Sequence, residues 1–294
     1  MKIPTVFHKD YSANTSTSSM RKLLPVATEA ERSLFATLIP PKDSHLLAIE
    51  DKLKKIHCSH YVESFMAGRG SLASSNGFDW TESIRNGVLA MNAGMLTAAE
   101  LAKSNGVAAN VSQGFHHSRP KYGAGFCTFN GLALVANENK KQKVFVLDCD
   151  QHGGDGTAEF ALTLPNLFNY SICGSTFGTQ RHKRSVVDYI QGPINKDFSP
   201  YEAALNRAFK QVEKVNPDLV IYQAGADPHI DDPFGSVGLT NEQMFLRDKI
   251  VFEYFKSKEI PIFFVLAGGY QEMDNLVKLH VGTFKAASQA FEAR

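Results

Sequence analysis

The chain has 294 residues, of which 43% are hydrophobic and 21% charged, and its 31 basic and 30 acidic side chains give a formal net charge of +1. This composition is that of an ordinary globular protein, and near-neutrality gives no electrostatic attraction to nucleic acid or to a membrane surface. No run of ~18 apolar residues predicts a transmembrane helix, and the N-terminus lacks the apolar core of a signal peptide. Because the four scattered cysteines favour a reducing compartment, we expect a cytoplasmic protein.

In chain order, an opening strand is followed by a Ser/Thr-rich loop at 12–20 and by a second loop at 68–80. Apolar residues then recur at helical spacing and predict a long helix from Thr81 to Ser104, ending before the pair Asn105-Gly106.

Apolar strands and helices alternate through the rest of the chain. Strands are predicted at 106–112, 143–150, 168–173, 217–227 and 260–270. Helices are predicted at 130–141, 157–164, 199–216, 240–258 and 274–292. The helix at 199–216 has Ser199 as its candidate N-cap and Pro200 at its first position. Continuous apolar strands alternating with helices indicate a mostly parallel sheet with helices on both faces, so we predict one doubly wound α/β domain over 1–294.

Polar residues follow these strands at the points where they end. His116 and His117 come after the strand at 106–112, and Asp148 lies at the end of the strand at 143–150. Asp227 and Tyr270 occupy similar places farther along the chain. In a doubly wound sheet the ligand crevice lies beyond the carboxyl ends of the strands, so we expect these side chains to meet at one edge.

Three of the residues at this edge form a candidate metal site. Asp150 and His152 are two residues apart, on the same side if the strand pattern continues through them, and Asp227 comes from another strand. Two carboxylates and one imidazole suit zinc or another divalent ion and leave a position open for water and substrate. A single aspartate is as readily a cap or turn residue, but three converging ligands favour a metal.

The remaining edge residues suit acid–base chemistry. His116 and His117 could share the proton transfers that a metal-activated water requires, with Asp148 and Asp155 as acceptors that fix their tautomers. Tyr270 follows two glycines and could donate a hydrogen bond to a developing oxyanion. Taken alone, the two histidines would be interpreted as surface residues, and the tyrosine could equally be part of an ordinary turn.

Four segments in this order resemble the metal-dependent histone deacetylase superfamily, which has the arginase/deacetylase fold. They are "GFHHSRPKYGAGFCTFNGLALVA" (114–136), "DCDQHGGDGT" (148–157), "QAGADPHIDDPFG" (223–235) and "AGGYQ" (267–271). The resemblance covers nearly the whole chain, and the forms "AGGYQ" and "AANVSQGFHH" are most like the class IV-like and bacterial members.

The resemblance implies a role for each matching residue. It implies one zinc ion, with iron(II) as the alternative, bound by Asp150, His152 and Asp227. It makes His116 and His117 the base and acid pair, backed by Asp148 and Asp155, with Tyr270 polarising the scissile carbonyl. Gly125 and Phe126 would line a tunnel for the acyl-lysine side chain. A potassium ion is implied near Asp148, Asp150 and Ser171.

The sequence also departs from its relatives in the superfamily. Gly153 and Cys173 stand where many members have histidine, and the first loop lacks the usual His-Pro pair. Arginases of the same fold bind two metals, but here Gly154 and His229 occupy positions where they have carboxylates. We therefore expect a single metal and amide rather than guanidine hydrolysis.

The predicted activity is zinc-dependent hydrolysis of acetyl or longer acyl groups from a protein's lysine side chains or from a small acylated amine. The alternatives are an acetylpolyamine amidohydrolase, a two-metal hydrolase and a catalytically silent acyl-binding protein. A polyamine enzyme is expected to carry acids at the tunnel mouth, where Asp79 and Glu82 are candidates, whereas Trp80 is expected to pack. The cluster His57, Cys58 and His60 has no second cluster to complete a metal site, so a capping or packing role is favoured.

Overall fold

The computed structural model describes residues 1–292 and contains one eight-stranded sheet whose neighbouring strands all run parallel. The strand order is β2-β1-β3-β8-β7-β4-β5-β6. The strands are β1 (Ile3–Val6), β2 (Ala36–Ile39), β3 (Val107–Asn110), β4 (Val144–Asp148), β5 (Leu167–Cys173), β6 (Ser185–Tyr189), β7 (Leu219–Gln223) and β8 (Ile262–Val265). The predicted doubly wound α/β fold is confirmed.

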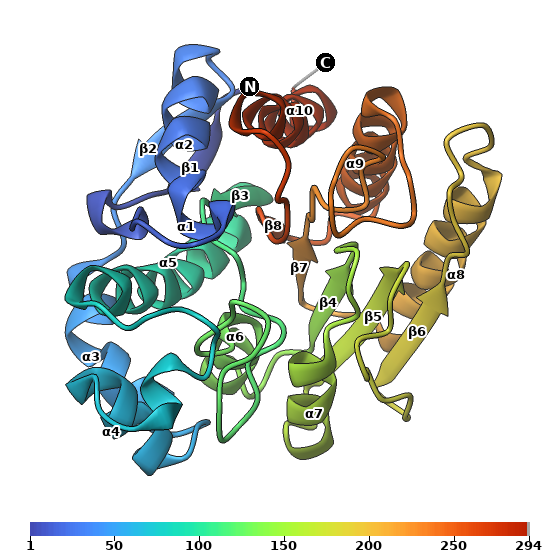
Figure 1. Cartoon of the computed structure of the whole chain (residues 1–294). Helices are drawn as coiled ribbons and strands as arrows, with labels where there is room; N and C mark the ends of the chain where they lie inside the picture. The colour runs from blue at the N-terminus through green and yellow to red at the C-terminus, as the bar shows by residue number, and fades with distance from the viewer. Residues whose placement is uncertain (293–294) are drawn as a thin grey trace.

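Helices cover both faces of this sheet (Figure 1). On one side lie α2 (Leu23–Arg32), α8 (Ser199–Val215), α9 (Asn241–Ser257) and α10 (Met273–Phe291), and on the other α5 (Glu82–Asn105), α6 (Gly131–Glu138) and α7 (Asp155–Thr163). The remaining α-helices, α1 (Ser18–Arg21), α3 (Asp43–Lys54) and α4 (Ser59–Ala67), belong to the N-terminal third. Within residues 1–292, no helix combines the length and the apolar character needed to cross a bilayer.

The core is the centre of the sheet, where β3, β8, β7 and β4 are buried along their whole length. These are the strands whose continuous apolar runs predict a sheet covered on both faces. The two edge strands, β2 and β6, are only partly buried and have no such run, so the sequence pattern did not predict them.

Several predicted boundaries were wrong, and the strands predicted at 217–227 and 260–270 already end at Gln223 and Val265. The helix α8 is capped by Phe198, and Ser199 is its first residue, with its hydroxyl donating to Asp197 Oδ2 at 2.9 Å. The loop predicted at 12–20 contains the start of α1, which is capped by the Thr17 hydroxyl. The strand predicted at 143–150 ends at Asp148, so the residues after it lie on a loop.

Candidate active site

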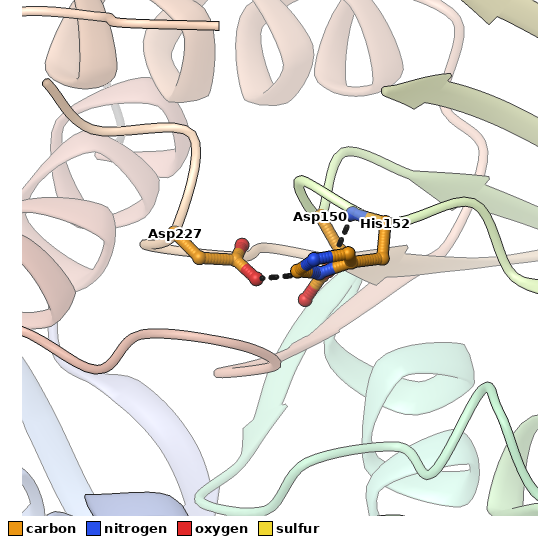
Figure 2. A group of neighbouring side chains, drawn as sticks. All are labelled: Asp150, His152 and Asp227. Carbon is orange, nitrogen blue, oxygen red and sulfur yellow. Dashed lines mark hydrogen bonds and ion pairs between the residues drawn. The ribbon is translucent and has the colours of Figure 1, made fainter. Parts of the chain in front are cut away.

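The three predicted metal ligands lie together at the carboxyl edge of the sheet. β4 and β7 are paired in register, with Asp148 opposite Gln223, so the loops that leave them start side by side. Asp150 and His152 lie on the first loop and Asp227 on the second, and one ligand atom from each lies within 4.8 Å of the others. Figure 2 shows the imidazole of His152 between the two carboxylates.

Backbone groups hold both carboxylates in place. Asp150 Oδ2 accepts from Gly268 N at 2.7 Å, and Asp227 Oδ1 accepts from Gln151 N at 2.9 Å. The other oxygen of each faces His152 Nδ1, at 3.4 Å from Asp150 and 3.3 Å from Asp227. Within the described chain, Asp227 Oδ2 is buried without a hydrogen bond of normal geometry.

The electrostatics of this cluster favour a bound cation. Burial raises the pKa of Asp227, and the neighbouring Asp150 carboxylate raises it further, to about 7. Burial opposes protonation of His152, but its two carboxylate partners outweigh this effect and raise its pKa to about 10. Two buried carboxylates that face one imidazole, one of them with an oxygen that accepts no hydrogen bond, fit a divalent ion with carboxylate and imidazole ligands.

The positions that matter for a second metal carry no carboxylate. Gly154 lies so close to Asp148 that an added Cβ would be 2.5 Å from Oδ2. His229 Nδ1 accepts from the backbone N–H of Asp231 at 3.2 Å. Neither residue joins the ligand cluster.

Two histidine–aspartate pairs stand beside the ligands. His116 Nδ1 donates to Asp148 Oδ2 at 2.8 Å, and His117 Nδ1 donates to Asp155 Oδ1 at 2.6 Å. All four side chains are buried. Because each Nδ1 is occupied, Nε2 is the atom of each ring that remains for proton transfer.

The two histidines differ in charge. Burial opposes the charged form of His116, but the carboxylates of Asp148 and Asp150 outweigh it and raise its pKa to about 9. Burial lowers the pKa of His117, and the positive charge of His116 lowers it further, to about 4, against the attraction of Asp155. At neutral pH, His116 is therefore protonated and His117 is neutral.

A cavity of about 250 Å³ opens above these groups, lined by His117, Gly125, Phe126, His152, Phe177, Phe234 and Tyr270. Gly125 has a φ of +51°, and an added Cβ would lie 2.5 Å from His117 Cδ2. Only glycine lets the backbone pass so close to the imidazole. Gly125 and Phe126 thus lie in the wall of this cavity beside His117.

Tyr270 enters this cavity from the segment after β8. Its backbone N–H donates to Asp232 Oδ2 at 2.7 Å, and its ring meets Phe234 edge-on at 4.9 Å between centroids. Burial, reinforced by Asp227 and Asp150, raises the pKa of its phenol well above the usual value. The hydroxyl therefore stays protonated and available as a donor. Gly268 makes the approach possible, since an added Cβ would lie 2.1 Å from Asp227 Oδ2.

Two aromatic walls of the cavity were not predicted. Phe177 lies over His117 at 4.2 Å between centroids and has a φ of +47°. Phe234 lies in the quoted segment 223–235 but had no role assigned to it. In both cases the only signal in the sequence is a Phe-Gly pair in a loop beyond a strand.

Other predicted residues lie away from the cavity. Asp79 and Glu82 are exposed and do not line it. Trp80 packs as expected, with its indole N–H donating to Phe65 O at 2.6 Å. Ser171 accepts from Gly154 N at 3.2 Å beside Asp148, and Cys173 is buried at the end of β5. In the cluster predicted to cap or pack, His57 is buried, whereas Cys58 and His60 are exposed.

Comparison with known proteins matches a family model described as the histone deacetylase domain over residues 19–284. An uncharacterized protein of Picosynechococcus sp. is 28% identical over 99% of this chain and 100% of its own length. Histone deacetylase 2 of Arabidopsis thaliana is 28% identical over 61% of this chain and 48% of its own. The acetoin utilization protein AcuC of Staphylococcus aureus is 26% identical over 73% and 63%, so this chain spans less than two thirds of these two relatives.

Among solved structures, the crystal structure of an acetylpolyamine aminohydrolase from Burkholderia pseudomallei has a similar fold. It superposes with a TM-score of 0.82 at 17% identity and covers 97% of this chain and 98% of its own.

Proposed function

This chain belongs to the histone deacetylase family, and we propose that it is a zinc-dependent hydrolase that removes acetyl or longer acyl groups from lysine side chains or related amines. The observation that supports this most strongly is the convergence of three ligands, two histidine–aspartate pairs and one tyrosine on a single channel. We further propose that residues 1–294 form one catalytic domain. A cytoplasmic location fits the four free cysteines.

Asp150, His152 and Asp227 are the proposed ligands of a single metal ion. The buried Asp227 Oδ2, which accepts no hydrogen bond of normal geometry, and the two carboxylates around one imidazole support this assignment. Bound zinc would polarise the substrate carbonyl and lower the pKa of a bound water towards ~7. Iron(II) is the alternative metal for this donor set. A potassium ion near Asp148, Asp150 and Ser171 is part of the same proposal.

The chain's own side chains handle the protons. His117 is neutral at pH 7, so its Nε2 can accept the proton of the attacking water. His116 carries a proton and is the proposed donor to the leaving amine. Tyr270 keeps its proton and donates a hydrogen bond to the oxyanion, a contact of a kind worth roughly 2.7–4 kcal/mol in the transition state.

The channel walls support acyl-lysine as the preferred substrate. Phe126, Phe177 and Phe234 surround the cavity, and no carboxylate of residues 1–292 is among its lining residues. The carboxylates of the proposed metal site lie below it. Aromatic walls suit the methylene stem of a lysine side chain. A polyamine carries further positive charges, and these would lose their hydration in the cavity without a carboxylate to pair with. The similarity to an acetylpolyamine aminohydrolase keeps that activity as the second candidate, although at 17% identity it supports the fold alone.

The test is an assay of zinc-loaded protein on acyl-lysine peptides of several chain lengths and on acetylpolyamines. We expect hydrolysis of the peptides, with Tyr270→Phe and His117→Ala losing most activity while keeping zinc. Tyr189→Phe, on the exposed face of β6, is the matched control and should retain activity. Zinc-containing wild-type protein that hydrolyses none of the panel would favour the silent acyl-binding protein, and two zinc ions per chain would favour the two-metal hydrolase.

A further inference from the structure

A third residue is bonded to only one of the two histidine–aspartate pairs. Arg119 lies two residues after His117, and its Nη2 donates to Asp155 Oδ2 at 2.6 Å. Asp155 Oδ1 accepts from His117 Nδ1 at 2.6 Å, so the carboxylate receives one donor on each oxygen. Arg119 Nη1 donates to Glu159 Oε2 at 2.6 Å, one turn farther along α7. An arginine, a carboxylate and an imidazole therefore form a single chain.

The backbone of Arg119 is also fixed. Its N–H donates to Tyr122 O at 2.9 Å, and its carbonyl accepts from His57 Nδ1 at 3.1 Å. His57 Nε2 in turn accepts from the backbone N–H of Asn130 at 3.1 Å. Burial lowers the pKa of His57 to about 3, so the ring is neutral and can donate at one nitrogen while accepting at the other. The guanidinium is thus held in place before any substrate binds.

The other pair lacks this cation. Asp148 Oδ2 accepts from His116 Nδ1 at 2.8 Å, and Asp148 Oδ1 accepts from Asp150 N at 3.2 Å. No lysine or arginine of residues 1–292 pairs with Asp148, whereas Arg119 neutralises Asp155. A carboxylate shared with a guanidinium attracts an imidazole proton less strongly than one that is not shared.

We propose that Arg119 is a positioning residue that orients Asp155 towards His117 Nδ1 and balances its charge, and that it thereby fixes the orientation and tautomer of the His117 ring. This inference rests on the proposed function. An exposed ion pair is worth little, but the Asp155 side chain is only 3% exposed, so the carboxylate cannot replace a lost guanidinium with bulk water.

The experiment compares Arg119→Gln with Arg119→Lys in zinc-loaded protein. We expect Arg119→Gln to lower kcat by about 10- to 100-fold, as loss of an outer hydrogen-bond partner does, with KM nearly unchanged. Arg119→Lys keeps the charge and should recover most of the loss. Arg207→Gln removes a similar arginine–aspartate pair on the far helix α8, at 2.9 Å from Asp188, and should behave as wild type. Thermal unfolding of each variant identifies any that fails to fold.

A second measurement does not depend on turnover. Nitrogen-15 NMR of the imidazole reports the proton on His117 Nδ1, and Arg119→Gln should shift this signal while Arg207→Gln leaves it in place. A shift in protein whose wild type is inactive would support the inference and refute the proposed function. Active wild type, with Arg119→Gln unchanged in both kcat and the His117 signal, would overturn the inference alone. An equal loss of kcat in Arg119→Lys and Arg119→Gln, both folded, would overturn the role of charge.

Discussion

Arg247 on α9 joins the two loops that carry the metal ligands, and its removal should destabilise the protein strongly. The side chain is 1% exposed, and its Nη1 donates to Gly225 O at 2.8 Å and to Cys149 O at 3.2 Å. Gly225 lies two residues before the proposed ligand Asp227, and Cys149 lies one residue before the proposed ligand Asp150. Its Nε and Nη2 both lie 2.8 Å from Asp248 Oδ1.

The size of the effect follows from what Arg247→Met leaves behind. Breaking a buried ion pair by removing one partner costs about 3–5 kcal/mol, because the remaining charge is buried without compensation. Here Asp248 would keep only its hydroxyl donors, Tyr222 and Thr283. At roughly 2–4 °C per kcal/mol for a chain of this size class, Tm should fall by about 6–20 °C.

The assay is urea unfolding of metal-free protein, so that loss of metal does not add to the result. Lys258→Met is the control, because its pair with Glu213 is exposed at 2.9 Å and should cost less than about 1 kcal/mol. The double variant Arg247→Met, Asp248→Asn should be less destabilised than the two single changes added together. A loss below 1 kcal/mol for Arg247→Met, or strict additivity in the double variant, would refute the reasoning.

The remaining predictions concern the channel, the metal and pH. Gly125→Ala pushes a methyl group against His117 and should lower kcat by about 100-fold with zinc content unchanged, measured by steady-state kinetics and metal analysis. Asp227→Asn should weaken zinc binding by more than about 100-fold in a competition titration with a chelator. Phe177→Ala should raise KM for an acyl-lysine peptide by about tenfold, because the ring lines the cavity. The ring is 45% exposed and is not part of the hydrophobic core, so the protein should still fold. Burial lowers the pKa of His57 from its usual 6.5 to about 3 in the folded protein. The folded protein therefore has its full stability above pH 6.5 and loses stability as pH falls towards 3, because the unfolded chain binds a proton that the folded one does not. In urea unfolding, the difference in unfolding free energy between pH 7 and pH 5 should be smaller by about 2 kcal/mol in His57→Gln.

The ligand cluster could be predicted because its residues follow directly on buried strands. The same burial explains why the end of β4 was misplaced. Cys149, Asp150 and Gln151 are as buried as the strand before them, so their pattern does not reveal that the ladder ends at Asp148. The ligands therefore reach the site from a loop, oriented by backbone donors rather than by strand alternation.

The channel walls and the roles of Arg119 and Arg247 could not be predicted from spacing. Phe177 has a left-handed backbone conformation that the folded loop imposes on a residue that rarely adopts it. Arg119 is 36 residues from Asp155, and Arg247 is 98 residues from Cys149. Contacts between residues so far apart in the chain leave no periodic pattern in the sequence. Taken alone, each arginine is therefore interpreted as a charged surface residue.

The segment before Tyr270 shows how such distant contacts fix a catalytic group. Lys22 Nζ donates to Ala267 O, and the Ser18 hydroxyl donates to Gly269 O at 2.6 Å. Between them, Gly268 N–H donates to Asp150 Oδ2, so one short stretch of backbone is bonded both to α1 and its flank and to a proposed metal ligand.

This arrangement gives the wrongly predicted loop at 12–20 a function. Its last residues form α1, whose polar side chains support the backbone that carries Tyr270. Burial lowers the pKa of Lys22 to about 8, against the attraction of Asp227, Asp150 and Asp232, so the lysine remains mostly charged at neutral pH. Because that charge interacts with the carboxylates of the metal site, the N-terminal segment both holds the tyrosine segment and offsets part of the negative charge there. A shift of α1 should therefore reach the tyrosine and the ligands together, although none of its residues lines the channel.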